Sequence, residues 1–453
     1  QLPPHAAWKM VGTLAHPLNR PVINPETKCV ERGYGVIQPR VAISILGAGR
    51  SRFANLFAGE VGIDPYTRMV SNSSHDLFGR GQFIGKGIYD VAAFHAAVGG
   101  RFPENRILSH DLIEGCHARC GFLNDVELIE DHPSRFLVDV TRRLRWIRGD
   151  WQIAAWLCRY VPSASGKQQR NPLDLLSRWL IFDNLRRSLV AVAFLAALIM
   201  VWLMPGCDPL LGTAVLLGLW FLPQALRILW SVPQPPKHLP LRTHWADITR
   251  RESRQVLVEL IELCCVPYTA LCSLGAIVRV YWRMYFSHRH LLEWQTAHDA
   301  ERGTRQDCAA VFWEMKANPA MALLTAVTIG TFNQAALLIA GPLLCSWMLA
   351  PLVVWWISRS SRSPPSRLRP DQQAFLRGLA RRTWSYIERF AGPEQNWLPP
   401  DNYQESPGAQ LAERTSPTNI GLCLLSTVAA WDFGYLSARS TVQRLGNTLR
   451  ALE

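Results

Sequence analysis

The sequence predicts an α-helical membrane region between two water-facing parts, the first α/β and the second helical. Composition supports this division, because the 453 residues are 49% hydrophobic and only 18% charged and include 18 tryptophans, whereas soluble proteins average about 25% charged residues. The long apolar runs all lie between residues 188 and 357. The net charge is +13, and basic residues flank those runs. This composition excludes a disordered or collagen-like chain.

The first 165 residues alternate short β-branched segments with helical stretches and glycine-rich turns, which is typical of an α/β part. Gly33 to Gln38 predicts a strand that stops at Pro39, and Asp125 to Glu130 alternates polar and apolar residues as a half-buried strand does. Between them, segment 79–87 has four glycines in nine residues. It could bind an anion with Lys86, or be a flexible turn, and it lacks P-loop spacing.

Two further segments carry groups that can do chemistry. Asp111, in the sequence SHDLIEG, could deprotonate a hydroxyl or cap a helix. Segment 142–152 has four arginines and two tryptophans, which could hold a diphosphate beside a sugar, or form a basic helix on a membrane surface. Cys116, His117 and Cys120 lack a second ligand pair at zinc spacing, so we interpret the cysteines as ordinary reduced residues.

The membrane region is predicted to cross the bilayer four times as two hairpins. Each apolar run is long enough, or nearly so, to cross about 30 Å of hydrocarbon. The turns would lie at 205–208 and at Gly341. Arginines and lysines precede the first run, separate the pairs and follow the last run, which predicts that all three flanks are cytoplasmic. The predicted spans are 188–204, 209–230, 319–340 and 342–357, after a cytoplasmic linker at 166–187.

The apolar stretch 256–282 is a separate case. It contains Glu259 and Glu262 and has arginines at both ends. Glutamates at membrane depth are costly. We therefore interpret the stretch as an interfacial or re-entrant helix, with a fifth span as the alternative.

A linker at 358–370 leads into the second water-facing part, residues 371–453. Amphipathic helical spacing is visible in 375–390 and again in 420–436, with proline and asparagine turns between them. The pattern predicts a helix pair. That pair could begin an α/α toroid or be an ordinary helical hairpin.

Several motifs, taken in order, carry a family resemblance. An acidic motif followed some thirty residues later by Arg142-x-x-Arg145-Trp146 resembles the acid motif and QxxRW box of inverting, processive family 2-like glycosyltransferases. Eight longer segments then resemble the cyclic β-1,2-glucan synthase family over nearly the whole chain. These segments are 11–21, 62–66, 83–90, 109–115, 145–152, 290–294, 396–402 and 414–422.

The resemblance implies a domain organisation and an activity. Residues 1–165 would be the C-terminal half of an α/β, GT-A-like glycosyltransferase domain, 188–357 a transmembrane bundle, and 371–453 the first helices of a glucoamylase-like α/α toroid. The enzyme would transfer glucose from UDP-glucose to a growing β-1,2-glucan, with inversion. It would lie in the bacterial inner membrane with both soluble parts cytoplasmic. The expected partners are UDP-glucose, the glucan acceptor and the lipid bilayer, and nucleic acid is not expected.

The resemblance also implies roles for single residues. Asp111 would be the general base, Arg145 would contact the diphosphate, and Trp146 would line the acceptor sugar. The other residues expected to bind substrate are Arg142, Gly85, Lys86, Gln38 and His110.

The chain departs from the family pattern in two places. Arg142 occupies the position of the glutamine of the box, which favours a charge role there. No Asp-x-Asp motif occurs in the chain, so Mg²⁺ or Mn²⁺ is expected only for the complete enzyme, with that motif just before Gln1. We therefore expect a fragment that is inactive alone and has no metal ligands of its own. The alternatives are another processive β-glucan synthase, or a membrane-anchored scaffold or binding module without catalysis.

Overall fold

The computed structural model describes residues 3, 5–58, 73–231, 241–294, 301, 307–360 and 368–453. They fall into two compact units, Gln1–Ser363 and Pro364–Glu453. This division lies inside the predicted linker 358–370. The segment 62–66, quoted for the family resemblance, lies outside the described residues. The first unit contains both the N-terminal part and the apolar helices.

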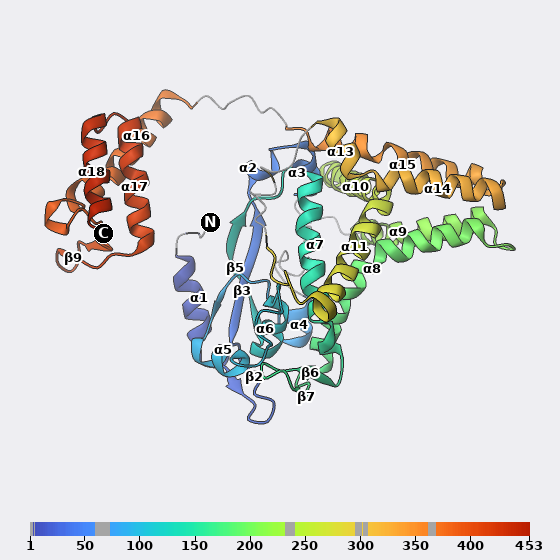
Figure 1. Ribbon diagram of the computed structural model, residues 1–453, viewed down its shortest axis with the longest axis horizontal. Helices are drawn as coiled ribbons and strands as arrows, with labels where there is room; N and C mark the ends of the chain where they lie inside the picture. Colours follow the sequence, from blue (N-terminus) through green and yellow to red (C-terminus); the bar gives the residue numbers. More distant parts are fainter. Residues whose placement is uncertain are drawn as a thin grey trace. The chain divides into compact units, whose positions relative to one another are not determined.

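A three-stranded sheet forms the centre of the N-terminal part, in the order β4 (Ile88–Tyr89), β3 (Val36–Ile43) and β5 (Cys120–Glu130) (Figure 1). β3 runs antiparallel to β4 and parallel to β5. The strand predicted at 125–130 is confirmed as the second half of β5. The prediction that the first strand stops at Pro39 is wrong. Proline is tolerated there because the pairing with β5 is irregular directly after it, and an irregular pair does not need its N–H.

Helices cover both faces of this sheet. Ile37, Leu123 and Val126 pack with Ala6 and Met10 of α1 (Ala6–Ala15). On the opposite face, Val36 and Cys120 pack with residues of α5 (Val91–Val98) and α6 (Asp111–Ala118). The alternation of side chains along a strand produces this division. The other elements of this part are η1 (Pro17–Asn19), β1 (Val22–Ile23), β2 (Val30–Arg32), α2 (Ile45–Ala48), α3 (Arg52–Phe57), α4 (Ser73–Phe78), α7 (Phe136–Gln152), η3 (Ala154–Leu157), β6 (Tyr160–Pro162) and β7 (Gln168–Arg170).

Four apolar helices run side by side away from the sheet: α8 (Leu175–Leu203), α9 (Pro209–Ser231), α14 (Ala317–Phe332) and α15 (Ala336–Ser358) (Figure 1). Among the described residues, α8, α9 and α15 are long and apolar enough to cross a membrane. α14 is also apolar but has only 16 residues. The structure therefore supports three of the four predicted spans by length and composition, and the fourth is short.

The second hairpin turns at a different place from the predicted one. α14 ends at Phe332 and α15 begins at Ala336, so Gly341 lies inside a helix. Asn333 closes α14, because its backbone N–H donates to the carbonyl of Ile329 and its side chain donates to the carbonyl of Trp202 in α8. Pro342 does not end α15. Prolines are tolerated in membrane helices, where neighbouring helices satisfy the freed backbone groups.

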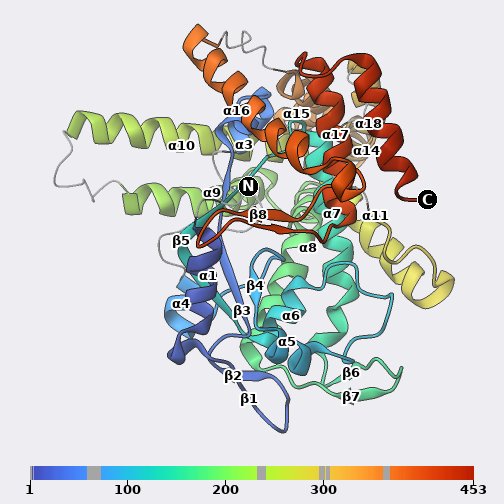
Figure 2. The ribbon, with the colours of Figure 1, turned by 90° about the vertical axis from the view of Figure 1, so that its left-hand side faces the viewer.

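The stretch predicted as one helix at 256–282 belongs to two helices, α10 (Leu241–Cys264) and α11 (Val266–Trp282), which bend by 64° at Cys265. Pro267 lies in the first turn of α11, and a proline there cannot continue the helix before it. Figure 2 shows the two helices leaving the bend in different directions. α11 runs beside α7, and a π-helical turn, η4 (Arg283–Ser287), follows it. Among the described residues, α13 (Cys308–Glu314) comes next.

The second unit is a small helical body. Helices are confirmed at both predicted places, as α16 (Pro370–Phe390) and α17 (Pro417–Asp432). Trp384 of α16 is 3% exposed, and Arg444 of α18 (Ala438–Arg450) lies over its ring. The remaining elements are η5 (Pro393–Gln395), β8 (Asn402–Gln404) and β9 (Gln410–Ala412). The toroid stays a prediction.

Candidate functional site

Asp111 is the first residue of α6 and comes directly after His110, the N-cap residue. Its carboxylate makes no hydrogen bond or ion pair with any residue that the structure describes. Asp111 is therefore not acting as a helix cap, which was the alternative to a chemical role. The loop before it is fixed against α7, because a Cβ at Gly149 would lie 2.3 Å from that of Ser109.

The surroundings of Asp111 make its carboxylate a stronger base. Burial raises the pKa of Asp111 and is the largest effect. The nearby charges of His110, Lys86 and Arg145 lower the pKa, and Glu114 raises it, but the sum remains upward. A carboxylate with a raised pKa is better suited to accept a proton from a hydroxyl.

The glycine-rich segment contacts Asp111 through its backbone. Gly85 has a φ of +77°, and a Cβ built on it would lie 2.6 Å from Oδ1 of Asp111. A side chain at this position would therefore meet both backbone strain and the carboxylate. The structure brings Gly85 and Asp111 together across 26 positions of sequence, which the sequence alone did not show.

Gln38 connects the glycine-rich segment to β3 by a hydrogen bond. It is completely buried in β3, its Oε1 accepts a hydrogen bond from the backbone N–H of Ile84 at 3.2 Å, and its Nε2 donates to the carbonyl of Pro39. Both ends of the side chain are therefore bonded to backbone. This placement favours a role in holding Gly85 beside Asp111 over direct contact with a substrate.

Lys86 is near Asp111 but is already paired. Its Nζ lies 2.5 Å from Oε2 of Glu130, at the end of β5. The pair is about one third exposed, so it remains accessible to water. Lys86 can still contribute positive potential at the site, although an anion would compete with Glu130 for it.

The two arginines of the predicted box have different surroundings. Arg142 forms an ion pair with the buried Asp139 at 2.5 Å and lies over the ring of Trp146. Arg145 has no hydrogen bond or ion pair within the described part of the chain, and its guanidinium lies 5.8 Å from the ring centre of Trp294. Of the two, Arg145 is therefore the guanidinium that remains available to an anion, and it is near enough to Asp111 to lower the pKa of that carboxyl.

Asp139 also belongs to a charge network that connects α7 with α10, the first helix of the bent pair. Arg143 pairs with Asp139 at 3.0 Å and with Glu262 of α10 at 3.4 Å. Burial opposes ionisation of Asp139, but the two arginines outweigh it and hold its pKa below the usual range. Glu262, one of the two glutamates that would be costly at membrane depth, therefore pairs with Arg143 where α10 meets α7.

Sequence reasoning gave no place in the site to the short segment 288–294, which follows η4. Glu293 pairs with Arg283 of η4 at 2.8 Å, and its carbonyl accepts a hydrogen bond from Arg148 of α7 at 3.0 Å. Trp294 contacts Arg145 in the way described. The signal in the sequence was the HLLEW motif at 290–294, one of the segments that carry the family resemblance.

His110, Asp111 and Glu114 form a group whose ligand atoms lie within 4.8 Å of one another. The group does not fit Mg²⁺ or Mn²⁺ well. His110 Nδ1 is hydrogen-bonded to Glu114 Oε1 at 2.8 Å, and that bond is the main reason why the pKa of His110 is raised. Nδ1 of His110 is thus already engaged by Glu114, and Mg²⁺ prefers oxygen ligands. We assign no metal to this group, and the metal expected for the complete enzyme stays a prediction.

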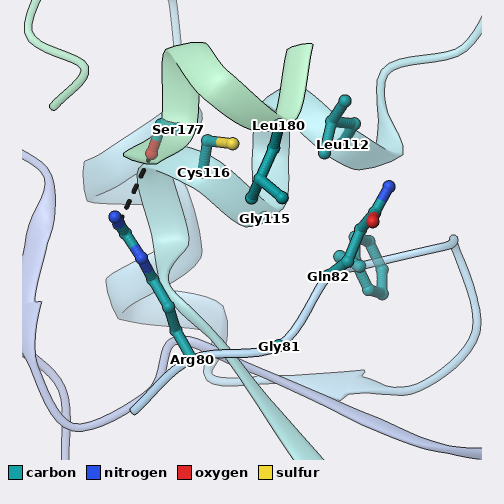
Figure 3. Close-up of a pocket in the computed structure, with 9 residues that line it drawn as sticks. Arg80, Gly81, Gln82, Leu112, Gly115, Cys116, Ser177 and Leu180 are labelled. Carbon is teal, nitrogen blue, oxygen red and sulfur yellow. Dashed lines mark hydrogen bonds between the residues drawn. The ribbon is translucent and has the colours of Figure 1, made fainter. Parts of the chain in front are cut away.

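A small pocket lies behind the site, between segment 80–83, α6 and the first turns of α8 (Figure 3). Arg80 reaches across it to Ser177, 3.4 Å away, and pairs with Asp174. Asp111 and Arg145 do not line this pocket. It marks the junction of α6 with α8, and it places the beginning of an apolar helix directly against the helix that carries Asp111.

Comparison with known proteins finds a relative that matches nearly the whole chain. No family model matches the chain. The chain is 38% identical, over 455 residues, to the cyclic beta-(1,2)-glucan synthase NdvB of Rhizobium meliloti (strain 1021). The match covers 99% of this chain and 16% of the length of that relative. On this identity across nearly all of its residues, the chain belongs to the cyclic β-(1,2)-glucan synthase family.

Proposed function

We propose that the chain contributes the acceptor side of an inverting glucosyltransferase site, which moves glucose from UDP-glucose onto a growing β-1,2-glucan. Membership of the synthase family supports the reaction class. The observation that carries the assignment of residues is the partly buried carboxylate of Asp111, with the guanidinium of Arg145 near enough to lower its pKa; neither group has a hydrogen bond or ion pair within the described residues.

The residues suit a single displacement step. The acceptor hydroxyl gives its proton to Asp111 while its oxygen attacks the anomeric carbon from the face opposite the leaving group. The bond from that carbon to the diphosphate oxygen breaks, and its electron pair stays on UDP. Arg145 would then stabilise the negative charge that grows on the diphosphate. Trp146 would offer a face to the acceptor sugar, while Gln38 and Gly85 keep the base in place.

The test replaces the base in the complete synthase. Asp111→Asn should lower the rate of glucan formation from UDP-glucose by roughly a thousandfold, because the amide cannot take the proton. Asp125→Asn is the matched control, since Asp125 is exposed and only pairs loosely with Lys9 at 3.8 Å. Radiolabelled product, identified by its linkage, is the measurement. Unchanged synthesis by Asp111→Asn would refute the assignment of the base.

We further propose that the N-terminal part faces the cytoplasm of an inner membrane, with the turn between α8 and α9 outside. Two exposed native cysteines can decide this, Cys158 in the N-terminal part and Cys207 in that turn. In a Cys345→Ala variant, a membrane-impermeant maleimide should label Cys207 in sealed spheroplasts and Cys158 only after permeabilisation. Labelling of Cys158 in sealed spheroplasts would contradict the orientation.

A further inference from the structure

One buried amide joins three segments of the site. Gln152 is the last residue of α7 and is 4% exposed. Its Oε1 accepts a hydrogen bond from the backbone N–H of Leu108 at 2.6 Å, and its Nε2 donates to the carbonyl of Leu291 at 3.1 Å. α7, the loop before α6 and segment 288–294 therefore meet at a single side chain.

Each of these segments carries a group of the candidate site. Asp111 follows Leu108 by three positions, Trp294 follows Leu291 by three, and Arg145 lies two helical turns before Gln152. The ring of Trp294 lies against Arg145. A change in how Gln152 is bonded would shift the proton acceptor and the guanidinium relative to each other.

Neighbouring contacts show that this junction is tightly packed. The loop before α6 approaches α7 so closely at Gly149 that no side chain fits there. Arg148 donates to the carbonyl of Glu293, next to the segment that Gln152 holds. Only a planar group with an acceptor at one end and a donor at the other can make both bonds of Gln152. An apolar side chain of the same size would leave a buried N–H and a buried carbonyl unpaired.

We propose that Gln152 is a positioning residue for glucosyl transfer, which holds Asp111 in register with Arg145 and keeps segment 288–294 on α7. This inference rests on the proposed function, because the consequence for rate supposes that Asp111 is the base. It assigns no contact between Gln152 and the substrate.

The first test is Gln152→Met in the complete synthase. The variant keeps the volume and loses both hydrogen bonds, so kcat should fall by about tenfold to a hundredfold through misplacement of the base. The KM for UDP-glucose should change by less than about twofold, because the amide does not touch the donor. A folded variant with kcat within twofold of wild type would overturn the proposal.

The second test gives a signature that loss of packing would not. A neutral glutamic acid at 152 can accept from Leu108 with its carbonyl oxygen and donate to Leu291 with its hydroxyl, whereas the ionised form repels the Leu291 carbonyl. The rate of Gln152→Glu divided by that of wild type should therefore rise as the pH falls. Dividing by wild type removes the titration of Asp111 itself. Gln168→Glu, on an exposed strand, is the control and should give a flat ratio.

The outcomes separate this inference from the proposed function. A flat ratio for Gln152→Glu would overturn the positioning role even if Gln152→Met fails to fold. If wild type does not turn over UDP-glucose, the proposed function fails, and hydrogen exchange at Leu108 then decides the role of Gln152. Faster exchange of that amide in a variant at 152 than in wild type would support the junction, and equal exchange would overturn it.

Discussion

The two halves of α7, residues 136–143 and 144–152, share one helical backbone but differ in role: the first supports the fold and the second carries groups of the candidate site. In the first half, buried apolar residues pack against α10, α11 and α15, and Asp139, Arg142 and Arg143 are paired. In the second half, Arg145 has no ionic partner within the described residues, and Gln152 joins the loops of the site. Arg142 and Arg145 are three residues apart, so the comparison teaches that the partner of an arginine decides whether it supports the fold or is available to a substrate.

The largest loss of stability should come from the first half, at Asp139. Asp139→Asn leaves the partly buried guanidinium of Arg142 without its counter-charge and leaves Arg143 with Glu262 alone, which should cost about 3 kcal/mol of stability. Thermal unfolding in detergent measures this loss. Asp371→Asn, at an exposed ion pair of the second unit, should cost less than about 1 kcal/mol. Equal losses in the two variants would show that the network of α7 does not hold the fold.

In the second half, Arg145→Met should affect catalysis and spare stability. Losing one preorganised donor to the leaving group should lower kcat/KM by about a hundredfold. The thermal midpoint should hardly move, because Arg145 has no ion pair to lose within the described part of the chain. Arg159→Met, at an exposed arginine, is the control and should leave both quantities unchanged. A large loss of stability in Arg145→Met would erase the distinction between the halves.

A further effect, a gain of stability, depends on pH and concerns Asp150, a partly buried exception in the second half. Burial raises its pKa to about 7, against the opposing effects of a hydrogen bond from Asn184 and the charge of Arg187. The folded state therefore holds a proton that the unfolded state releases, and stability is lost as the pH rises toward 7.

Asp150→Asn stays neutral at every pH and can still accept from Asn184. Its stability advantage over wild type should be absent near pH 4, grow up to about pH 7 and then level off, at up to about 4 kcal/mol for the full shift from 3.8 to about 7. Thermal unfolding at pH 5, 6, 7 and 8 measures the trend. An advantage independent of pH would show that Asp150 is ionised in the fold.

The sequence predicted what depends on local pattern. Hydropathy located the apolar helices, and helical periodicity located α16 and α17, because both signals come from neighbouring residues. The turn of the second hairpin was misplaced because Pro342 resembles a helix breaker, whereas the turn depends on Asn333 bonding to α8. The strand through Pro39 was cut short for the same reason.

The candidate site was predictable in its residue types and not in its pairings. Asp111 and Arg145 were named from motifs, and the structure leaves both unpaired among the described residues. The contact of Arg143 with Glu262 joins positions 119 residues apart, and no local pattern signals it. The roles of Gln152 and Trp294 likewise depend on loops that meet only in the folded chain.

The absent side chain of Gly85 has a consequence for how this site can change. Since the main chain itself forms one wall beside the carboxylate of Asp111, residue 85 cannot be used to tune the base by adding a charge, a hydroxyl or a methyl group. If Asp111 is the base, changes in its surroundings are easier on α7, which carries Arg145 and Trp146. Substitutions on α7 can therefore alter the surroundings of Asp111, whereas a side chain at Gly85 would collide with its carboxylate.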